Sequence, residues 1–328
     1  MSQRSLLAIT GLIVSLAAAN ARAQAPSVQE LAGALGLSAA DVASAQAGSL
    51  VPGEAKPSNE RELTATLLFV VQGLTPTQLV GLSDQALLDR SDANTLRFGD
   101  VPAGGGADAF AKLELGAEQS QVWAAAAPGE TLNVSSAEIA ALGSASAIEP
   151  AVRELLAQRV ASYRAQGLAG IAPYARKDGA TRPAGDDLRS ATRASAALQK
   201  YAPNAYRALL DYPSTPVAGT KDLVRWSQIS AHDVPTIALT QMLYIPDGEA
   251  WVVAQRQFYV STGYNCEQAL AALLPVEGGT LVLYVNRTSS DQVTGWGGAM
   301  KRDLGSRILA SSLRELFEKA RAAAKAAR

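Results

Sequence analysis

Few side chains in this chain are suited to nucleophilic or metal chemistry. His232 is the only histidine and Cys266 the only cysteine, so a catalytic triad or a zinc site would have to use them. His232 lies within Ser230–Asp233, but adjacency in sequence is not triad geometry, and we interpret it as a loop histidine before a strand. A nucleophilic Cys266 would need His232 as its base, so we interpret it as a buried packing residue. The sequence therefore favours a protein that is not an enzyme, with no metal and no cofactor.

A glycine-rich run, Gly295-x-Gly297-Gly298, stands before the last helical segment. Such a run could hold a phosphate on its backbone N–H groups. It lacks the Lys-Ser/Thr pair of a P-loop and the full Gly-x-Gly-x-x-Gly pattern of a dinucleotide site. We therefore interpret it as a flexible hinge that lets the last helix turn back onto a sheet, because glycine has unusual backbone freedom.

Two arginines in strand-like segments raise the question of a ligand. Arg256 lies among apolar residues in mid-strand, and Asn286 with Arg287 ends a later strand. A buried arginine needs a partner, because an unpaired charge is costly to remove from water. Asp291 or Glu267 could pair with Arg256, and so could a ligand carboxylate. We favour structural ion pairs and keep the ligand as the alternative.

The C-terminal third carries the most regular pattern of the chain. Apolar residues predict strands over 236–245, 250–260 and 281–285. The first two are joined by Pro246-Asp247-Gly248, in which proline fixes φ, aspartate bonds its own backbone and glycine takes a positive φ. Residues 265–274 suit either a helix or a buried strand.

A long helix is predicted to begin near Gly298 or Ala299. Its apolar residues lie on one face at helical spacing, whereas Leu304 and Ile308 point elsewhere. The polar side of this helix is basic, which favours a solvated face over transient contact with a membrane surface. The predicted apolar stripe consists of Leu309, Leu313, Leu316, Phe317 and Ala320.

The upstream segments are richer in alanine and predict mainly helices. The alternating run at 62–72 predicts one more strand, covered on both faces. Cap signals at Ser27, Ser38 and Thr75, together with helical periodicity, predict helices at 27–47 (broken at Gly36, with a second start at Ser38), 75–88, 147–166 and 188–200. A loop with one short extended piece at 95–98 is expected at 91–106, an exposed loop at 177–187 and a further short strand at 110–115. Three prolines in 201–216 argue against long regular structure there.

The N-terminus predicts export. Arg4, the apolar run Leu6–Ala19 and the small-x-small site Ala21-Arg22-Ala23 are typical of a signal peptide cleaved after Ala23. The apolar run is about 14 residues, short of the roughly 20 that a spanning helix needs. We expect a periplasmic or secreted protein. The formal net charge of −1 becomes −3 after cleavage, which argues against nucleic acid as a partner.

These patterns predict an α+β fold, in which an antiparallel sheet wraps around a long C-terminal helix and further helices come from the N-terminal and middle regions. We divide the chain into a signal peptide (1–23), a helical segment with a linker (24–58) and a single α+β domain (59–328). The helical, loop-rich middle of that domain covers about 147–216.

A long helix held by a curved antiparallel sheet is the helix-grip arrangement. The runs that carry the likeness are Arg256–Ser261, Tyr284–Thr288 and Gly295–Gly298 with Lys301-Arg302. On these runs, the segment from Trp226 to Phe317 resembles the START-like (SRPBCC) superfamily of hydrophobic-ligand carriers and cyclases. It is also similar to an uncharacterised group of exported bacterial proteins. The stretch of about 160 residues between the first strand and the last three departs from a minimal helix-grip domain.

The resemblance implies a cavity between the sheet and the last helix that holds an apolar molecule or lipid. It implies no catalytic residues, because that superfamily shares no common catalytic set. The first hypothesis is therefore a ligand carrier, the second an exported scaffold protein whose aromatics are simply core, and the weakest a START-like cyclase or hydrolase-type enzyme. The candidate ligand-binding residues are Trp226, Tyr244, Arg256, Tyr259, Tyr284, Asn286, Arg287 and, at the mouth, Trp296.

Overall fold

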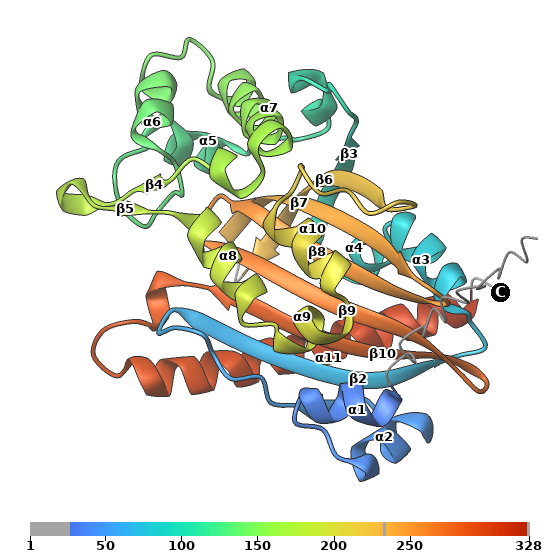
Figure 1. Ribbon diagram of the computed structural model, residues 1–328. Coiled ribbons are helices and arrows are strands. Elements are labelled where there is room, and N and C mark those ends of the chain that lie inside the picture. The colour runs from blue at the N-terminus through green and yellow to red at the C-terminus, as the bar shows by residue number, and fades with distance from the viewer. Residues whose placement is uncertain (1–26, 232–233, 327–328) are drawn as a thin grey trace, which may run out of the picture.

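A computed structural model of the chain describes residues 27–231 and 234–326, which form an α+β fold around an eight-stranded antiparallel sheet (Figure 1). The strand order is β1-β2-β10-β9-β8-β7-β6-β3. This confirms the predicted fold class. The predicted signal peptide and His232 lie outside the described residues. The strands are β1 (Val51–Gly53), β2 (Glu62–Gln72), β3 (Thr95–Val101), β6 (Lys221–Ala231), β7 (Val234–Asp247), β8 (Ala250–Val260), β9 (Cys266–Val276) and β10 (Gly279–Ser289).

The five consecutive strands β6–β10 form an antiparallel meander, as the regular pattern of the C-terminal third predicts. The turn between β7 and β8 contains Gly248 at φ 64°, in agreement with the predicted Pro-Asp-Gly turn. The ambiguous segment 265–274 is strand β9, because β8 and β10 pair with it on both sides. β2 then adds to the outer edge of β10 over its full length, and β1, within the predicted linker, pairs with β2.

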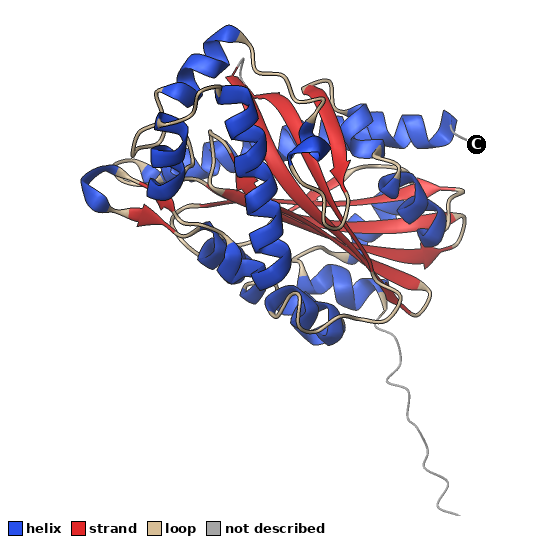
Figure 2. Ribbon diagram, turned by 90° about the horizontal axis from the view of Figure 1, so that it is seen from above, coloured by secondary structure: helices blue, strands red, loops and turns tan. Residues whose placement is uncertain are grey.

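Helices cover both faces of the sheet (Figures 1 and 2). We call one the α11 face, which bears the side chains of Phe69, Tyr284 and Ala271, and the other the α8 face, which bears Leu68 and Leu283. The α11 face is covered by α3 (Pro76–Asp84), α4 (Leu87–Ser91) and α11 (Gly298–Ala326). The α8 face is covered by α1 (Val28–Ala34), α2 (Ala39–Gln46), α5 (Ala117–Ala124), α6 (Ser136–Gly143), α7 (Ile148–Gln166), α8 (Ala184–Arg193), α9 (Ala196–Tyr201) and α10 (Pro203–Leu210).

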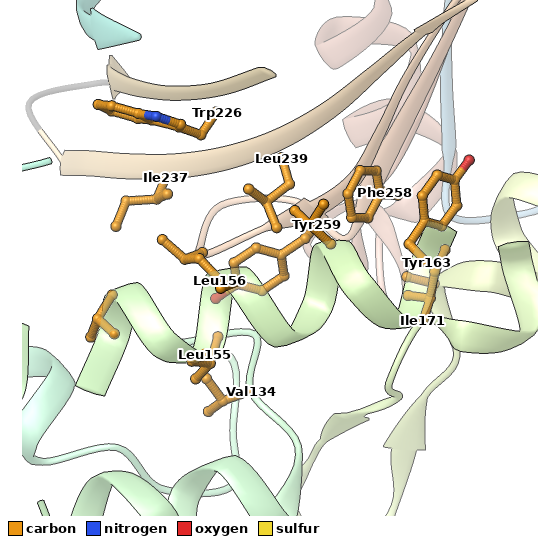
Figure 3. Packing of buried hydrophobic residues seen from close by; sticks show 14 of the residues in the cluster. Val134, Leu155, Leu156, Tyr163, Ile171, Trp226, Ile237, Leu239, Phe258 and Tyr259 are labelled. Atoms are coloured by element: carbon orange, nitrogen blue, oxygen red, sulfur yellow. The ribbon is translucent and has the colours of Figure 1, made fainter. Parts of the chain in front are cut away.

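The largest part of the core lies between α7 and the β6–β8 end of the sheet (Figure 3). The ring of Tyr163 on α7 stacks on Phe258 of β8 with centroids 4.0 Å apart. Leu156 on α7 belongs to the same buried cluster as Leu239 on β7 and Trp226 on β6. The middle of the chain is therefore part of the core, and its helices are fixed by burial against the sheet.

Three predicted elements differ from the structure. The helix expected at 75–88 ends at Asp84, and a separate helix, α4, follows after Ala86 at φ 61°. The strand expected at 110–115 is absent, because Ala107–Phe110 form a 3₁₀ turn that buries Phe110. The helix expected at 188–200 is two helices, α8 and α9, with the break at Ala194 and Ser195. The proline-containing segment 201–216 has no long regular element, as expected, but it contains the eight-residue helix α10, since Pro203 occupies the first helical turn, where a missing N–H costs nothing.

The predicted helix starts are confirmed at α1, α2 and α3. Ser27, Ser38 and Thr75 cap these helices with their side chains, each in a capping box. The last helix, α11, begins at Gly298, as expected. Within the described ranges, no helix combines the length and the apolar character that a bilayer span requires.

Candidate ligand-binding site

A cavity of about 90 Å³ lies on the α11 face, between the sheet and helices α3, α4 and α11. Its wall is almost entirely apolar. Every strand from β7 to β10 contributes to it, as does β2. Representative wall residues are Phe69, Leu88, Val253, Leu273, Tyr284 and Phe317.

The cavity follows from side-chain sizes on the α11 face. Phe317 of α11 lies over the sheet, with its ring centroid 4.8 Å from Tyr284 and 5.1 Å from Phe69. Between Glu267 and Leu273, β9 presents only the small side chains of Ala269 and Ala271 to this face. Small residues below a helix that is held away by aromatic rings leave space that no side chain fills.

The α11 face changes from apolar to polar along the strands. Side chains two residues apart on a strand share a face, so the register gives three successive rows across β10, β9 and β8. The first row is mainly apolar and lies in the cavity wall, the second row has one apolar side chain between two amides, of which Gln255 is in the wall, and the third row is polar. The rows are Tyr284, Ala271 and Val253; then Asn286, Ala269 and Gln255; then Thr288, Glu267 and Gln257.

Hydrogen bonds connect the third row, Thr288, Glu267 and Gln257, which we call the polar row, to the cavity. The hydroxyl of Thr288 lies 3.2 Å from Oε2 of Glu267 and 2.9 Å from Oδ1 of Asn286. The Nδ2 of Asn286 donates to the hydroxyl of Tyr284 at 3.2 Å, and the ring of Tyr284 is part of the cavity wall. A continuous polar chain thus leads from an apolar wall to a carboxylate.

Glu267 is an unusual residue in this setting. It is partly buried, and burial raises the pKa of its carboxyl, while hydrogen bonds from Asn286 and Thr288 offset part of that rise. It forms no ion pair with any residue in the described ranges. A carboxylate without a cation in such a place is costly to ionise.

The substitution Glu267→Gln is expected to raise the melting temperature at pH 7, with little or no gain near pH 4. Because the folded-state pKa lies above the ordinary value of 4.5, the folded wild type holds a proton that the unfolded chain has released. Wild-type stability should therefore fall as the pH rises from about 4 through the folded pKa, and glutamine removes that loss. Thermal unfolding at the two pH values measures it.

The neighbouring groups should not disturb this comparison. Burial also raises the pKa of Tyr264, Tyr284 and Cys266, so none of them titrates between pH 4 and 7. An equal gain in melting temperature at both pH values would show that ionisation of Glu267 is not the cause.

Three of the residues predicted from the sequence lie at or beside this cavity. Tyr284 is in its wall, and Asn286 is in the next row of the same strand. Tyr244 is buried on the same face, and its hydroxyl lies 3.1 Å from Oγ of Ser83, a wall residue from α3. Burial raises the pKa of Tyr244 to about 12, so this phenol stays neutral.

Four other predicted residues belong to the α8 face or its core. Tyr259 packs below the guanidinium of Arg159, which lies 4.1 Å from the ring centroid. The Nε1 of Trp226 donates to the carbonyl of Ala109 at 3.0 Å. Arg256 and Arg287 also point to this side, so the structure does not bring these four together with the cavity.

Arg256 has a different partner from the one expected. Its Nε donates to Oε1 of Gln268 at 2.9 Å, and its Nη2 donates to the hydroxyl of Thr192 at 3.0 Å. Glu267 cannot reach it, because Gln268 is the register partner of Arg256 and the preceding residue points to the opposite face. Asp291 is held instead by arginines elsewhere. The expected ion pair of Arg256 is therefore wrong.

Arg287 does form the structural ion pair that the sequence favours. Its Nη1 lies 2.7 Å from Oε2 of Glu62, and both side chains are buried. Trp296, by contrast, is 96% exposed in the turn before α11 and is not part of the cavity wall. Cys266 is buried, with its Sγ 3.6 Å from the carbonyl of Ala184, and burial raises the pKa of its thiol.

Comparison of the chain with protein-family models, with curated proteins and with solved structures finds no match. The resemblance to the START-like superfamily remains a prediction.

Proposed function

We propose that this chain is an exported, periplasmic or secreted, binding or carrier protein for an apolar small molecule or lipid. The observation that carries the proposal is the apolar cavity between the sheet and α11, at the place where a helix-grip fold would hold a ligand. The polar groups among its wall residues are few, as in sites for apolar ligands generally: Ser83, Gln255, Tyr284 and Arg321.

The volume of the cavity limits the size of the ligand. Pockets for drug-sized molecules measure about 300–1,000 Å³, and this cavity is about 90 Å³. One small ring or part of an acyl chain fits without rearrangement. A larger ligand would have to extend toward the polar rows or displace α11, which buries few of its own residues, among them Phe317, Ala320 and Ala324.

Binding of two apolar molecules tests the proposal: indole, which has the size that the cavity accepts, and the fluorescent probe N-phenyl-1-naphthylamine, which has to extend from the cavity toward the polar rows. Ala271→Leu fills the cavity from its floor and should weaken binding by at least about tenfold, a loss of about 1.4 kcal/mol. Ala272→Leu is the matched control, because the next residue of β9 points to the α8 face. Equal binding to both variants, or no binding to the folded wild type, would favour the scaffold alternative.

Export is a separate prediction. The signal peptide should be cleaved after Ala23, so the mature protein begins at Gln24. Expression in a bacterial host followed by N-terminal sequencing of the periplasmic fraction measures this. Periplasmic protein that still begins at Met1 would contradict the prediction. Native mass spectrometry of the same sample would reveal a co-purifying lipid.

A further inference from the structure

Among residues 27–231 and 234–326, no cation pairs with the polar row beside the cavity. Near the same end of the sheet, other covered carboxylates each meet arginine: Glu62 with Arg287, Asp187 with Arg61, and Asp291 with Arg176 and Arg182. In the described part of the chain, the neighbours of the Glu267 carboxylate are the neutral side chains of Thr288, Asn286 and Gln257. Since a covered carboxylate is normally paired, its counter-ion is the missing part of this arrangement.

We propose that Glu267, with Thr288 and Asn286, binds the ammonium head of an amphipathic ligand whose apolar part occupies the cavity. The proposal rests on the proposed function. Rows of side chains about 6–7 Å apart along the strands place the carboxylate two rows, or about 13 Å, beyond Tyr284, which is about the length of an extended ten-carbon chain. An ammonium ion supplies three donors to a carboxylate and the amide and hydroxyl oxygens beside it.

A series of ligands with one chain length and different heads tests this. Dodecylamine, dodecanol and dodecanoate are titrated into the protein in competition with N-phenyl-1-naphthylamine. Dodecylamine should bind at least about tenfold more tightly than dodecanoate, because the second head meets a like charge. Glu267→Gln should remove that preference and leave the affinity for dodecanol nearly unchanged. Glu277→Gln, in the exposed turn before β10, is the control and should change nothing.

The outcomes separate the two proposals. If dodecanol and the probe bind but Glu267→Gln leaves the head-group preference unchanged, the ammonium site is wrong and the carrier function stands. If dodecanol loses as much affinity as dodecylamine in that variant, the site takes a neutral donor and the ammonium assignment is wrong. If no ligand and no probe binds, both proposals fail.

A second, independent observation concerns the outer side of α11. Four apolar residues recur at every fourth position and point away from the sheet: Trp296, Met300, Leu304 and Ile308, which are 96%, 78%, 58% and 51% exposed. We call this set the outer stripe. Large apolar side chains gathered on one exposed surface normally mark a contact site.

We infer that the outer stripe docks on a bilayer that contains anionic lipid. Lys301 and Arg307 flank the stripe and are exposed, and Arg314 follows two turns after Arg307. Asp303 is the acid among them and pairs with Arg307 at 3.0 Å, so the basic charge exceeds the acidic charge beside the stripe. A helix with tryptophan and aliphatic residues on one side and basic residues beside them is suited to the membrane interface. The same half of α11 contacts Leu63, the register partner of Thr288, so docking would bring the polar row near the lipid surface.

Vesicle binding tests this inference. Vesicles of phosphatidylcholine with about one-third phosphatidylglycerol should bind the protein and shift its tryptophan emission to shorter wavelength, and pure phosphatidylcholine should bind it less. Leu304→Glu should abolish binding. Leu96→Glu is the control, because Leu96 is 51% exposed but isolated on β3.

Two different results would contradict docking of the outer stripe on a membrane. Equal vesicle binding by the wild type and Leu304→Glu would overturn the inference. So would a dimer in light scattering that Leu304→Glu converts to a monomer, because the stripe would then be covered by a second copy of this chain.

Discussion

Arg287→Met should lower the free energy of unfolding by about 3–5 kcal/mol, because it leaves the carboxylate of Glu62 buried without its cation. The two side chains are within 2.7 Å and both are covered. They join the N-terminal end of β2 to the C-terminal end of β10. Nη1 of Arg287 also donates to the carbonyl of Lys56 at 3.1 Å, so the loop before β2 loses a contact as well. Denaturant unfolding measures the loss.

Two variants give this prediction its controls. Arg307→Met breaks an exposed ion pair with Asp303 and should cost no more than about 1 kcal/mol. The double variant Glu62→Met/Arg287→Met removes both charges and should recover much of the lost stability. An Arg287→Met protein as stable as Arg307→Met would mean that the pair is effectively solvated.

Local chemistry made much of the fold predictable. The Pro-Asp-Gly turn, the capping boxes and the apolar alternation act within a few residues, so the meander and the helix starts could be derived from the sequence. Strand parity shows that Tyr284 and Glu267 share a face only once 265–274 is known to be a strand and its register with β10 is known. The choice between helix and strand for 265–274 depended on pairing with β8 and β10, which no local pattern determines.

Long-range pairing was outside the reach of the sequence pattern. β2 pairs with β10 across more than 200 residues, and only this pairing brings Phe69 next to Phe317. Trp296 was misjudged as a residue at the cavity mouth for a different reason. The glycines on both sides of it, Gly295 and Gly297, each adopt φ 72°, and the resulting turn leaves the indole in solvent.

Position on the apolar stripe of α11 did identify the residue that holds the helix to the sheet. Phe317 is buried against Phe69 and Tyr284, whereas Leu313 is only partly buried in the same cluster. The exposed Leu304 lies outside this predicted apolar stripe, as expected, and belongs to the outer stripe. Truncation of Phe317 should therefore lower the free energy of unfolding most, truncation of Leu313 less, and truncation of Leu304 least.

Phe317→Ala should lower the free energy of unfolding by about 3–5 kcal/mol, because it deletes a ring from the junction between α11 and the sheet. The deletion also joins the vacated space to the existing cavity, and apolar cavities of that kind stay dry and accept small aromatic molecules. Benzene or indole should therefore raise the melting temperature of the variant more than that of the wild type, since a ligand that binds only the folded state stabilises it. Leu304→Ala is the control and should stay within about 0.5 kcal/mol of the wild type. A Phe317→Ala variant as stable as this control would mean that the predicted apolar stripe does not hold α11 on the sheet. In that case α11 would not cover the cavity.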